Sequence, residues 1–228
     1  MKTSTQVVVI GGGVVGASIL YHLTKAGWTD VVLVERKELT AGSTWHAAGG
    51  MLTLNGDPNI AALQRYTVQL YKDIEEISGV SCGIHQTGEL MLADTEERLD
   101  WLRMIHARGQ YLSMETEMIS VAEAKEMLPI LEEKHFAGAM WDPVGGHVDP
   151  SGVTNAYAAA ARMAGAEVYR NTWAHDLIQK NDGTWDVVTE QGTINTEHIV
   201  NCGGLWAREV GRMCGIELPI LAMEHMYL

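Results

Sequence analysis

Short apolar runs separated by an amphipathic stretch open the chain. Residues 7–10 are apolar and β-branched, which is the pattern of a strand buried in a parallel sheet. Apolar residues then recur at helical spacing, and this helix is expected to end at Gly27. The residues with this spacing are Val15, Ile19, Leu20 and Leu23. Residues 31–34 predict a second buried strand, so the chain begins with the order strand, helix, strand.

The middle of the chain predicts helices and short strands. Residues 58–78 predict a helix with Pro58 in its first turn, and its apolar stripe is expected to pack in the core. The stripe consists of Ile60, Leu63, Thr67, Leu70, Ile74 and Ile77. The further predicted elements are a strand over 88–94, a helix over 95–109 capped by Thr95, a helix over 121–128, and an extended, turn-rich segment over 137–150.

From residue 150 onward, strands again alternate with helices. Small residues after Pro150 predict a helix that packs closely on a sheet and ends at Gly165. The elements predicted after it are a strand over 166–170, a hairpin of 177–180 and 185–188 around the turn 181–183, a turn at 191–192, and a strand within 198–207 that runs into a Gly-Gly turn and a helix. The order of elements predicts an α/β fold with a mostly parallel sheet and a β meander.

Composition and charge narrow the class of protein. The chain has 228 residues, of which 46% are hydrophobic, and a formal net charge of −13. No basic cluster interrupts the negative charge, which argues against a nucleic-acid or anionic-membrane surface. No apolar run reaches the roughly 18 residues that a membrane span needs, and the N-terminus lacks the pattern of a secretory signal.

The cysteines indicate the redox compartment. Cys82, Cys202 and Cys214 lie far apart in the sequence and form no C-x-x-C pair. Reduced structural thiols and a reducing compartment are therefore expected, and we place the chain in the cytoplasm. The sequence predicts no metal site.

A glycine motif joins the first predicted strand to the first helix. Gly11, Gly13 and Gly16 match G-x-G-x-x-G, in which the glycines allow a tight turn, close approach to a pyrophosphate, and close helix packing. Glu35 ends the second strand at the spacing of a carboxylate that accepts from a ribose hydroxyl. The motif predicts dinucleotide binding. Because Glu35 would repel a 2′-phosphate, NADP is disfavoured, and FAD and NAD remain open.

A second motif, GSTWHAAGG at residues 42–50, separates these two cofactors. The run RKELTAGSTWHAAGG after VVLVE resembles the N-terminal flavin domain of the dimethylglycine dehydrogenase and sarcosine dehydrogenase family, within the D-amino-acid-oxidase-like FAD-dependent oxidoreductases. Further stretches are similar to landmarks of that family in the expected order. They are GHVDP at 146–150, GAEV at 165–168, IVNCGGLWAREVG at 199–211 and EHMY at 224–227.

The resemblance implies a set of cofactor and substrate residues. It implies FAD as the cofactor, attached covalently through His46 at the 8α carbon of the flavin. The resemblance also implies that Ser43 and Thr44 lie near the pyrophosphate and that His225 and Tyr227, on one face of a strand, point toward the substrate. The other cofactor-binding residues that it implies are Arg36, Ala174 through its backbone near the adenine, Gly203 and Gly204. Two roles stay open for His147 in GGHVDP: it could fix the conformation of its loop, or it could line the active site.

The resemblance also gives an expected domain order. FAD-binding segments are expected at 1–86 and 148–215, and segments of an α+β, mixed-sheet substrate domain at 87–147 and 216–228. The family's catalytic unit continues further, so this substrate domain is expected to be incomplete. The chain is expected to be the front part of a larger enzyme, a split subunit completed by a second chain, or a truncated reading frame.

The function that the resemblance implies is the oxidation of a small N-methylated amino acid, such as dimethylglycine or sarcosine. A hydride would pass to the flavin, and formaldehyde would be released. The electron acceptor is open between oxygen, a quinone and an electron-transfer protein. The alternatives are a related FAD enzyme that acts on another amine, a D-amino acid or glycerol 3-phosphate, and a non-catalytic FAD-binding fragment. An NAD-dependent dehydrogenase would leave GSTWHAAGG without an explanation.

Overall fold

The computed structural model describes residues 1–226, and the chain divides into two compact units. The first unit contains Met1–Ala48, Ile74–Cys82 and the chain from Asp149 onward; the second contains Gly49–Asp73 and Gly83–Val148. Each unit is described by itself below. The four predicted domain segments stay a prediction.

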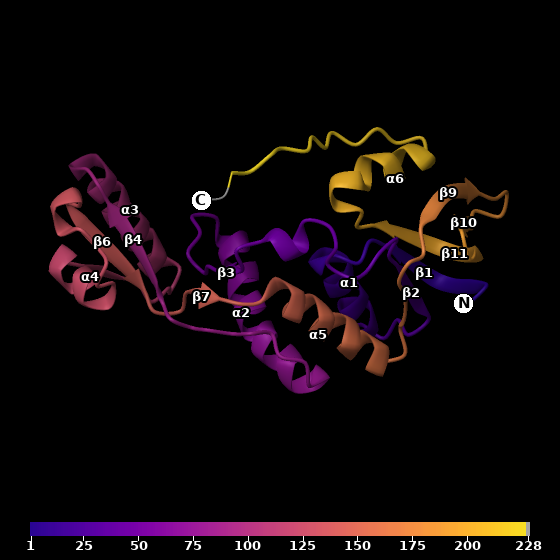
Figure 1. Cartoon of the computed structure of the whole chain (residues 1–228), viewed down its shortest axis with the longest axis horizontal. Helices are drawn as coiled ribbons and strands as arrows, with labels where there is room; N and C mark the ends of the chain where they lie inside the picture. Colours follow the sequence, from indigo (N-terminus) through magenta and orange to yellow (C-terminus); the bar gives the residue numbers. More distant parts are fainter. Residues whose placement is uncertain (227–228) are drawn as a thin grey trace. The chain divides into compact units, whose positions relative to one another are not determined.

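The first unit is built on a six-stranded sheet with the order β8-β2-β1-β11-β10-β9. The strands are β1 (Ser4–Ile10), β2 (Val31–Val34), β8 (Glu167–Tyr169), β9 (Ala174–Gln179), β10 (Trp185–Thr189) and β11 (Gly192–Asn201). β8, β2, β1 and β11 pair in parallel, whereas β10 pairs antiparallel with both β11 and β9. In Figure 1 the yellow strand β11 therefore lies beside the indigo strand β1. The predicted α/β fold, with a mostly parallel sheet and a β meander, is confirmed.

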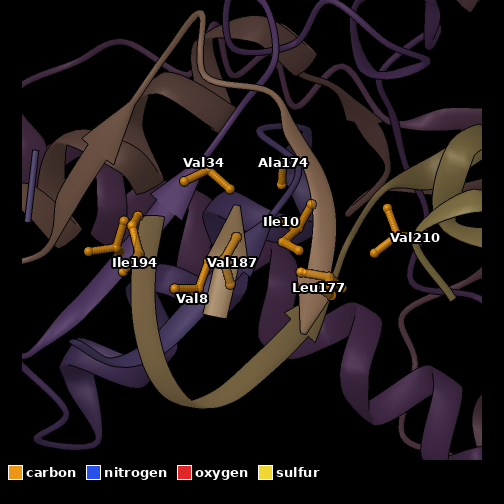
Figure 2. Packing of buried hydrophobic residues seen from close by; sticks show 9 residues of the cluster. Val8, Ile10, Val34, Ala174, Leu177, Val187, Ile194 and Val210 are labelled. Atoms are coloured by element: carbon orange, nitrogen blue, oxygen red, sulfur yellow. The ribbon is translucent and has the colours of Figure 1, made fainter. Parts of the chain in front are cut away.

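The core of this sheet comes from the apolar runs of the sequence. All four residues of β2 are buried, as are Val7, Val8, Val9 and Ile10 in β1. Figure 2 shows one cluster of this core, in which side chains from β1, β2, β9, β10 and β11 pack together with Val210 of helix α6 (Ala207–Met213). A strand that is buried on both faces needs a continuous apolar run, which explains why these short strands do not alternate with polar residues.

Two helices of the first unit pack against each other. They are α1 (Val14–Lys25) and α5 (Pro150–Met163), and the rings of Tyr21 and Tyr157 lie 5.6 Å apart between them. α5 starts where predicted, and the Asp149 side chain accepts from the Ser151 N–H at its N-terminus. Of the residues expected at helical spacing in α1, Val15 is 60% exposed. Leu20 is buried as expected, together with Gly16, Ala17, Tyr21 and Thr24, and the small Gly16 and Ala17 allow close packing on this face.

The predicted core stripe of α2 (Pro58–Ser78) is wrong in part. Leu70 and Ile74 are buried, but Leu63 is 59% exposed. Ile60 and Ile77 are also exposed, and Ala61 and Val68 are buried instead. Spacing identifies the apolar positions of a helix, but the neighbouring elements decide which of them lose contact with water.

The second unit contains a three-stranded sheet with the order β4-β6-β5, and helices pack on it. Its elements are β4 (Glu89–Ala93), α3 (Glu96–Tyr111), β5 (Glu117–Ile119), α4 (Val121–Met127) and β6 (Gly138–Asp142). The expected mixed sheet is antiparallel throughout the described residues. Thr95 caps α3 as predicted, since its side chain accepts from the Arg98 N–H.

A short two-stranded ladder and three 3₁₀ helices complete the described elements. β3 (Gly50–Met51) pairs with β7 (Gly146–His147) in the second unit. The 3₁₀ helices are η1 (Thr44–His46), η2 (Glu133–His135) and η3 (Gly204–Trp206). Over residues 1–226, no helix combines the length and the apolar character that a membrane crossing requires.

Candidate functional site

The glycine turn between β1 and α1 is packed against backbone on two sides. Gly11 has φ +115°, and a Cβ placed on it would lie 2.2 Å from the Cys202 carbonyl oxygen at the end of β11. A Cβ on Gly16 would lie 1.9 Å from the Gly11 carbonyl oxygen. These distances are far below van der Waals contact, so both positions require glycine. The turn therefore brings the start of α1 directly against the carboxyl ends of the central strands.

The N-terminus of α1 offers backbone donors to an anion. Gly13 is the N-cap residue, in extended backbone and without a side-chain cap, and the first turn of the helix contains no acidic residue. The Val14 N–H donates to the Thr44 hydroxyl at 3.0 Å, which joins the 42–50 segment to the helix N-terminus. The positive end of the helix dipole and the N–H groups of the first turn favour a phosphate at this position.

The Glu35 carboxylate faces the glycine turn. Its Oε2 accepts from the Gly12 N–H at 2.7 Å, and its Oε1 accepts from the Lys37 N–H at 2.8 Å. A carboxylate has further lone pairs, so Glu35 can also accept from hydroxyl groups of a ligand. Gly12 occupies a variable position of the G-x-G-x-x-G motif. A Cβ there would lie 2.7 Å from Leu39 and 2.9 Å from the Glu35 Cβ, so it too is restricted to a small residue.

The segment that carries His46 is tied to the same turn. The Thr40 N–H donates to the Gly12 carbonyl oxygen at 2.9 Å, and Thr40 has φ +71°. The 3₁₀ helix η1 follows, with His46 exposed at its end and the Trp45 ring 4.0 Å from the imidazole. His46 Nδ1 lies 3.1 Å from the Gly42 carbonyl oxygen. Because a carbonyl oxygen only accepts, Nδ1 carries the hydrogen in this contact.

The Gly-Gly turn after β11 is a second region of close backbone packing. Gly204 has φ +56°, and a Cβ on Gly203 would lie 3.1 Å from the Ala207 backbone. The neighbouring Cys202 is partly buried, and this burial raises the pKa of its thiol to about 11. The pair of glycines therefore has a structural cause within the chain itself, in addition to the predicted approach to a cofactor.

Three other predicted cofactor residues lie in the first unit with different surroundings. Ser43 is exposed and precedes η1, and its side chain makes no capping hydrogen bond there. Ala174 is buried at the start of β9 and belongs to the core cluster of the sheet. Arg36 is exposed, and its guanidinium lies 3.8 Å from the centroid of the Trp206 ring. Trp206 lies in the IVNCGGLWAREVG stretch, and the resemblance does not imply it as a site residue.

The structure does not place the predicted substrate residue His225 in a strand. Residues 216–226 form no strand, because they make no ladder pairing with another segment, and His225 is exposed within them. The predicted strand over this segment is therefore wrong for the described residues. Tyr227 lies outside the described residues.

His147 lies in the second unit and pins its own loop. It exchanges two backbone hydrogen bonds with His85, at 2.8 and 3.0 Å, and the two imidazole rings stack with centroids 4.9 Å apart. Within residues 1–226, no three His, Cys, Asp or Glu side chains are grouped so that they could hold a metal ion.

Comparison with known proteins identifies the family. The family described as "FAD dependent oxidoreductase" matches residues 6–228, and the chain belongs to this family of flavoenzymes. It is 41% identical over 227 residues to the mitochondrial dimethylglycine dehydrogenase of Homo sapiens, covering 100% of this chain and 26% of that protein. It is 35% identical over 237 residues to the mitochondrial sarcosine dehydrogenase of Homo sapiens, with the same coverage of 100% and 26%.

A relative whose name describes a regulatory role is also similar. The mitochondrial pyruvate dehydrogenase phosphatase regulatory subunit of Mus musculus is 36% identical over 231 residues, covering 100% of this chain and 26% of that protein. Among solved structures, the L-proline dehydrogenase from P. horikoshii superimposes with a TM-score of 0.87 at 30% identity, covering 95% of this chain and 57% of the other. The chain thus spans about a quarter of the length of each of these three curated relatives.

Proposed function

We propose that this chain is the cofactor-binding part of an FAD-dependent amine oxidoreductase that acts on a small N-methylated amino acid. The observation that carries the proposal is the attachment of the His46 segment to the glycine turn through Thr40 and Thr44. The same element that receives a pyrophosphate thereby holds the histidine predicted to bind the flavin. The similarity to dimethylglycine and sarcosine dehydrogenases supports the choice of substrate class.

Residues of the first unit suit the pyrophosphate and adenosine parts of FAD. Gly11, Gly13 and Gly16 bring the backbone of the turn close to the pyrophosphate. Because a hydroxyl that accepts one hydrogen bond can still donate its own hydrogen, Thr44 can serve a phosphate oxygen, with Ser43 beside it. Glu35 accepts from the ribose hydroxyls. The remaining residues of the proposed site are Arg36 and the Ala174 backbone on the adenosine side, and Gly203 and Gly204 at the second close approach.

His46 is proposed to attach the cofactor covalently. With Nδ1 protonated toward Gly42, the lone pair of a neutral imidazole resides on Nε2, which is the nucleophile. The new bond would join His46 Nε2 to the 8α carbon of the flavin. Overall, the imidazole and the 8α methyl group would each lose one hydrogen, and dioxygen would accept both with two electrons as hydrogen peroxide. FAD, once bound, supplies a two-electron acceptor for the substrate.

His225 and Tyr227 are proposed to contact the substrate. His225 would orient the amine or take a proton from its ammonium form, since an imidazole nitrogen can accept a proton. Loss of a hydride from the N-methyl carbon would leave an iminium ion, and water would convert this ion to formaldehyde and the demethylated amine. The electrons would leave to oxygen, a quinone or an electron-transfer protein.

The covalent link is tested on a denaturing gel. The chain is expressed with riboflavin supplied, denatured, and viewed under ultraviolet light and by intact-mass measurement. We expect a fluorescent band with the added mass of FAD, which is absent in His46→Ala. His198→Ala is the matched control, because His198 is an exposed histidine of β11 in the same unit and should keep the band. A wild-type chain of sequence mass alone would contradict the covalent link.

The substrate class needs a separate measurement. An extended chain is incubated with dimethylglycine or sarcosine, and formaldehyde release is compared with that from D-amino acids. Formaldehyde from the N-methyl substrates is the expected result. Oxidation of D-amino acids without formaldehyde would favour the related oxidases.

A non-catalytic, FAD-binding role is the second candidate. The similarity to a protein named as a phosphatase regulatory subunit favours it, since that name describes no oxidation. The two roles are distinguished by anaerobic titration, because a catalytic flavin loses its visible absorbance with substrate and an inert flavin keeps it. The two dehydrogenases are named as mitochondrial, whereas the cysteines led us to propose the cytoplasm, and subcellular fractionation decides between them.

A further inference from the structure

We propose that Trp206 is the positioning residue for the segment that carries His46. This inference rests on the proposed covalent attachment of FAD at His46. Trp206 comes from the Gly-Gly turn after β11, far from His46 in sequence, and its ring faces that segment at Gly42.

The backbone around Trp206 is fixed by a local hydrogen-bond network. The Trp206 N–H donates to the Gly203 carbonyl oxygen at 2.9 Å within η3. The Asn201 side chain spans the turn, because its Nδ2 donates to the Ala207 carbonyl oxygen at 2.8 Å and its Oδ1 accepts from the Gly203 N–H at 3.1 Å. The indole therefore leaves the sheet from a defined turn, even though the side chain is 40% exposed.

The indole lies between the end of β2 and the His46 segment. The guanidinium of Arg36, which follows β2, lies 3.8 Å from the ring centroid and makes a cation–π contact. A Cβ placed on Gly42 would lie 3.5 Å from the ring, so the indole faces the side of Gly42 that carries no side chain and leaves room there for about one carbon atom. A tryptophan with 40% of its surface exposed adds less to the core than a buried one, so core packing alone is a poor explanation for it.

Gly42 transmits this contact to the imidazole. Its carbonyl oxygen lies 3.1 Å from His46 Nδ1, so the position of the Gly42 peptide sets the rotation of the ring and directs Nε2. Thr40 and Thr44 hold the two sides of Gly42 to the glycine turn. Trp206 is the third support, and it restrains the peptide between them. Bond formation needs the reacting atoms in a narrow geometry, so the loss of this support should slow attachment more than it weakens FAD binding.

The experiment separates binding from attachment. The purified 228-residue chain, prepared without flavin, is mixed with FAD in air, and samples are denatured over time. Covalent FAD is measured by gel fluorescence and intact mass, and total bound FAD by absorbance after gel filtration. The variants are Trp206→Ala, Trp206→Phe and Arg36→Met. Trp28→Ala is the matched control, since Trp28 is a half-exposed tryptophan beyond the opposite end of α1.

For Trp206→Ala we expect wild-type FAD binding with attachment slowed by about tenfold or more. Trp206→Phe, which keeps an aromatic face for Arg36 and Gly42, should recover most of the rate, and Trp28→Ala should match the wild type. If Trp206→Ala does not fold, Arg36→Met is measured at saturating FAD, and slower attachment of the bound fraction is expected.

Three outcomes would overturn the inference. A wild-type attachment rate in Trp206→Ala, or in Arg36→Met where the alanine variant does not fold, removes the positioning role and leaves the His46 proposal intact. Weaker FAD binding with unchanged attachment of the bound fraction makes Trp206 a binding contact instead. A wild-type chain that binds FAD without any covalent band overturns the His46 proposal and the Trp206 inference together.

Discussion

A single methyl group on Gly16 should separate α1 from the sheet. The Cβ of Gly16→Ala would lie 1.9 Å from the Gly11 carbonyl oxygen and 3.1 Å from its carbon, whereas ordinary contact begins at 3.4 Å. Both atoms belong to the Gly11 backbone, which is itself held in place because the Gly11 N–H donates to the Val34 carbonyl oxygen at 2.9 Å. The helix start or the turn must therefore move, because no flexible side chain can yield.

The expected cost follows from this geometry. Overpacking a rigid core costs about 1–3 kcal/mol, and a backbone clash of this depth belongs at the upper end of that range. For a chain of this size, about 3 kcal/mol lowers the melting temperature by about 6–12 °C. The N-terminus of α1 would also leave its position, so we expect FAD affinity to fall together with stability.

Thermal unfolding followed by circular dichroism measures the first effect, and FAD fluorescence quenching measures the second. Gly56→Ala is the control substitution, because a Cβ there would meet no atom within 4 Å. It should leave the melting temperature unchanged or raise it slightly, since alanine restricts the unfolded chain. A Gly16→Ala variant that melts within 2 °C of the control would refute the packing argument.

Two further substitutions and one chemical modification test individual side chains. Glu35→Gln leaves one acceptor oxygen for two backbone donors, so FAD affinity should fall by about tenfold in fluorescence titrations; an unchanged affinity would contradict the assigned contact. Burial raises the pKa of the Glu89 carboxyl, and the neighbouring Asp142 adds to this effect. The charged form of Glu89 is therefore less stable in the folded state than in the unfolded chain. This penalty is absent below the pKa of Glu89 in the unfolded chain, grows as the pH rises from there, and is complete above the raised pKa of the folded state. Glu89→Gln should therefore raise the melting temperature at pH 8 and leave it unchanged at pH 3; equal gains at both values would exclude this cause. Because burial raises the pKa of Cys202 to about 11, its thiol should resist iodoacetamide at pH 8 until the chain is unfolded, as mass spectrometry can show.

Some site residues could be predicted because their signals are local. A glycine turn, a helix start and an acid at the end of a strand each depend on a few neighbouring residues. Gly11 and Gly16 could therefore be singled out, and the structure gives a steric reason for both. Glu35 also lies where its spacing indicated, with its carboxylate toward the glycine turn.

Other site features depend on contacts between distant segments. The Thr44 hydroxyl binds the Val14 N–H from a different loop, and no sequence pattern encodes that distance. Trp206 reaches Gly42 and Arg36 only because β11 lies beside β1 in the sheet. The predicted strand that carried His225 failed for the same reason, since a strand needs a paired neighbour and residues 216–226 have none among the described residues.

The sequence by itself determined the order of strands and helices, the glycine turn and most helix starts. These features follow from backbone sterics and from the periods of 2 and 3.6 residues, which act within a few positions of the chain. The tertiary structure decided which face of α2 is buried, which side chains meet around His46, and how the meander extends the sheet. Burial and side-chain contacts depend on what packs against each element, and that information is distributed over residues that are distant in the sequence.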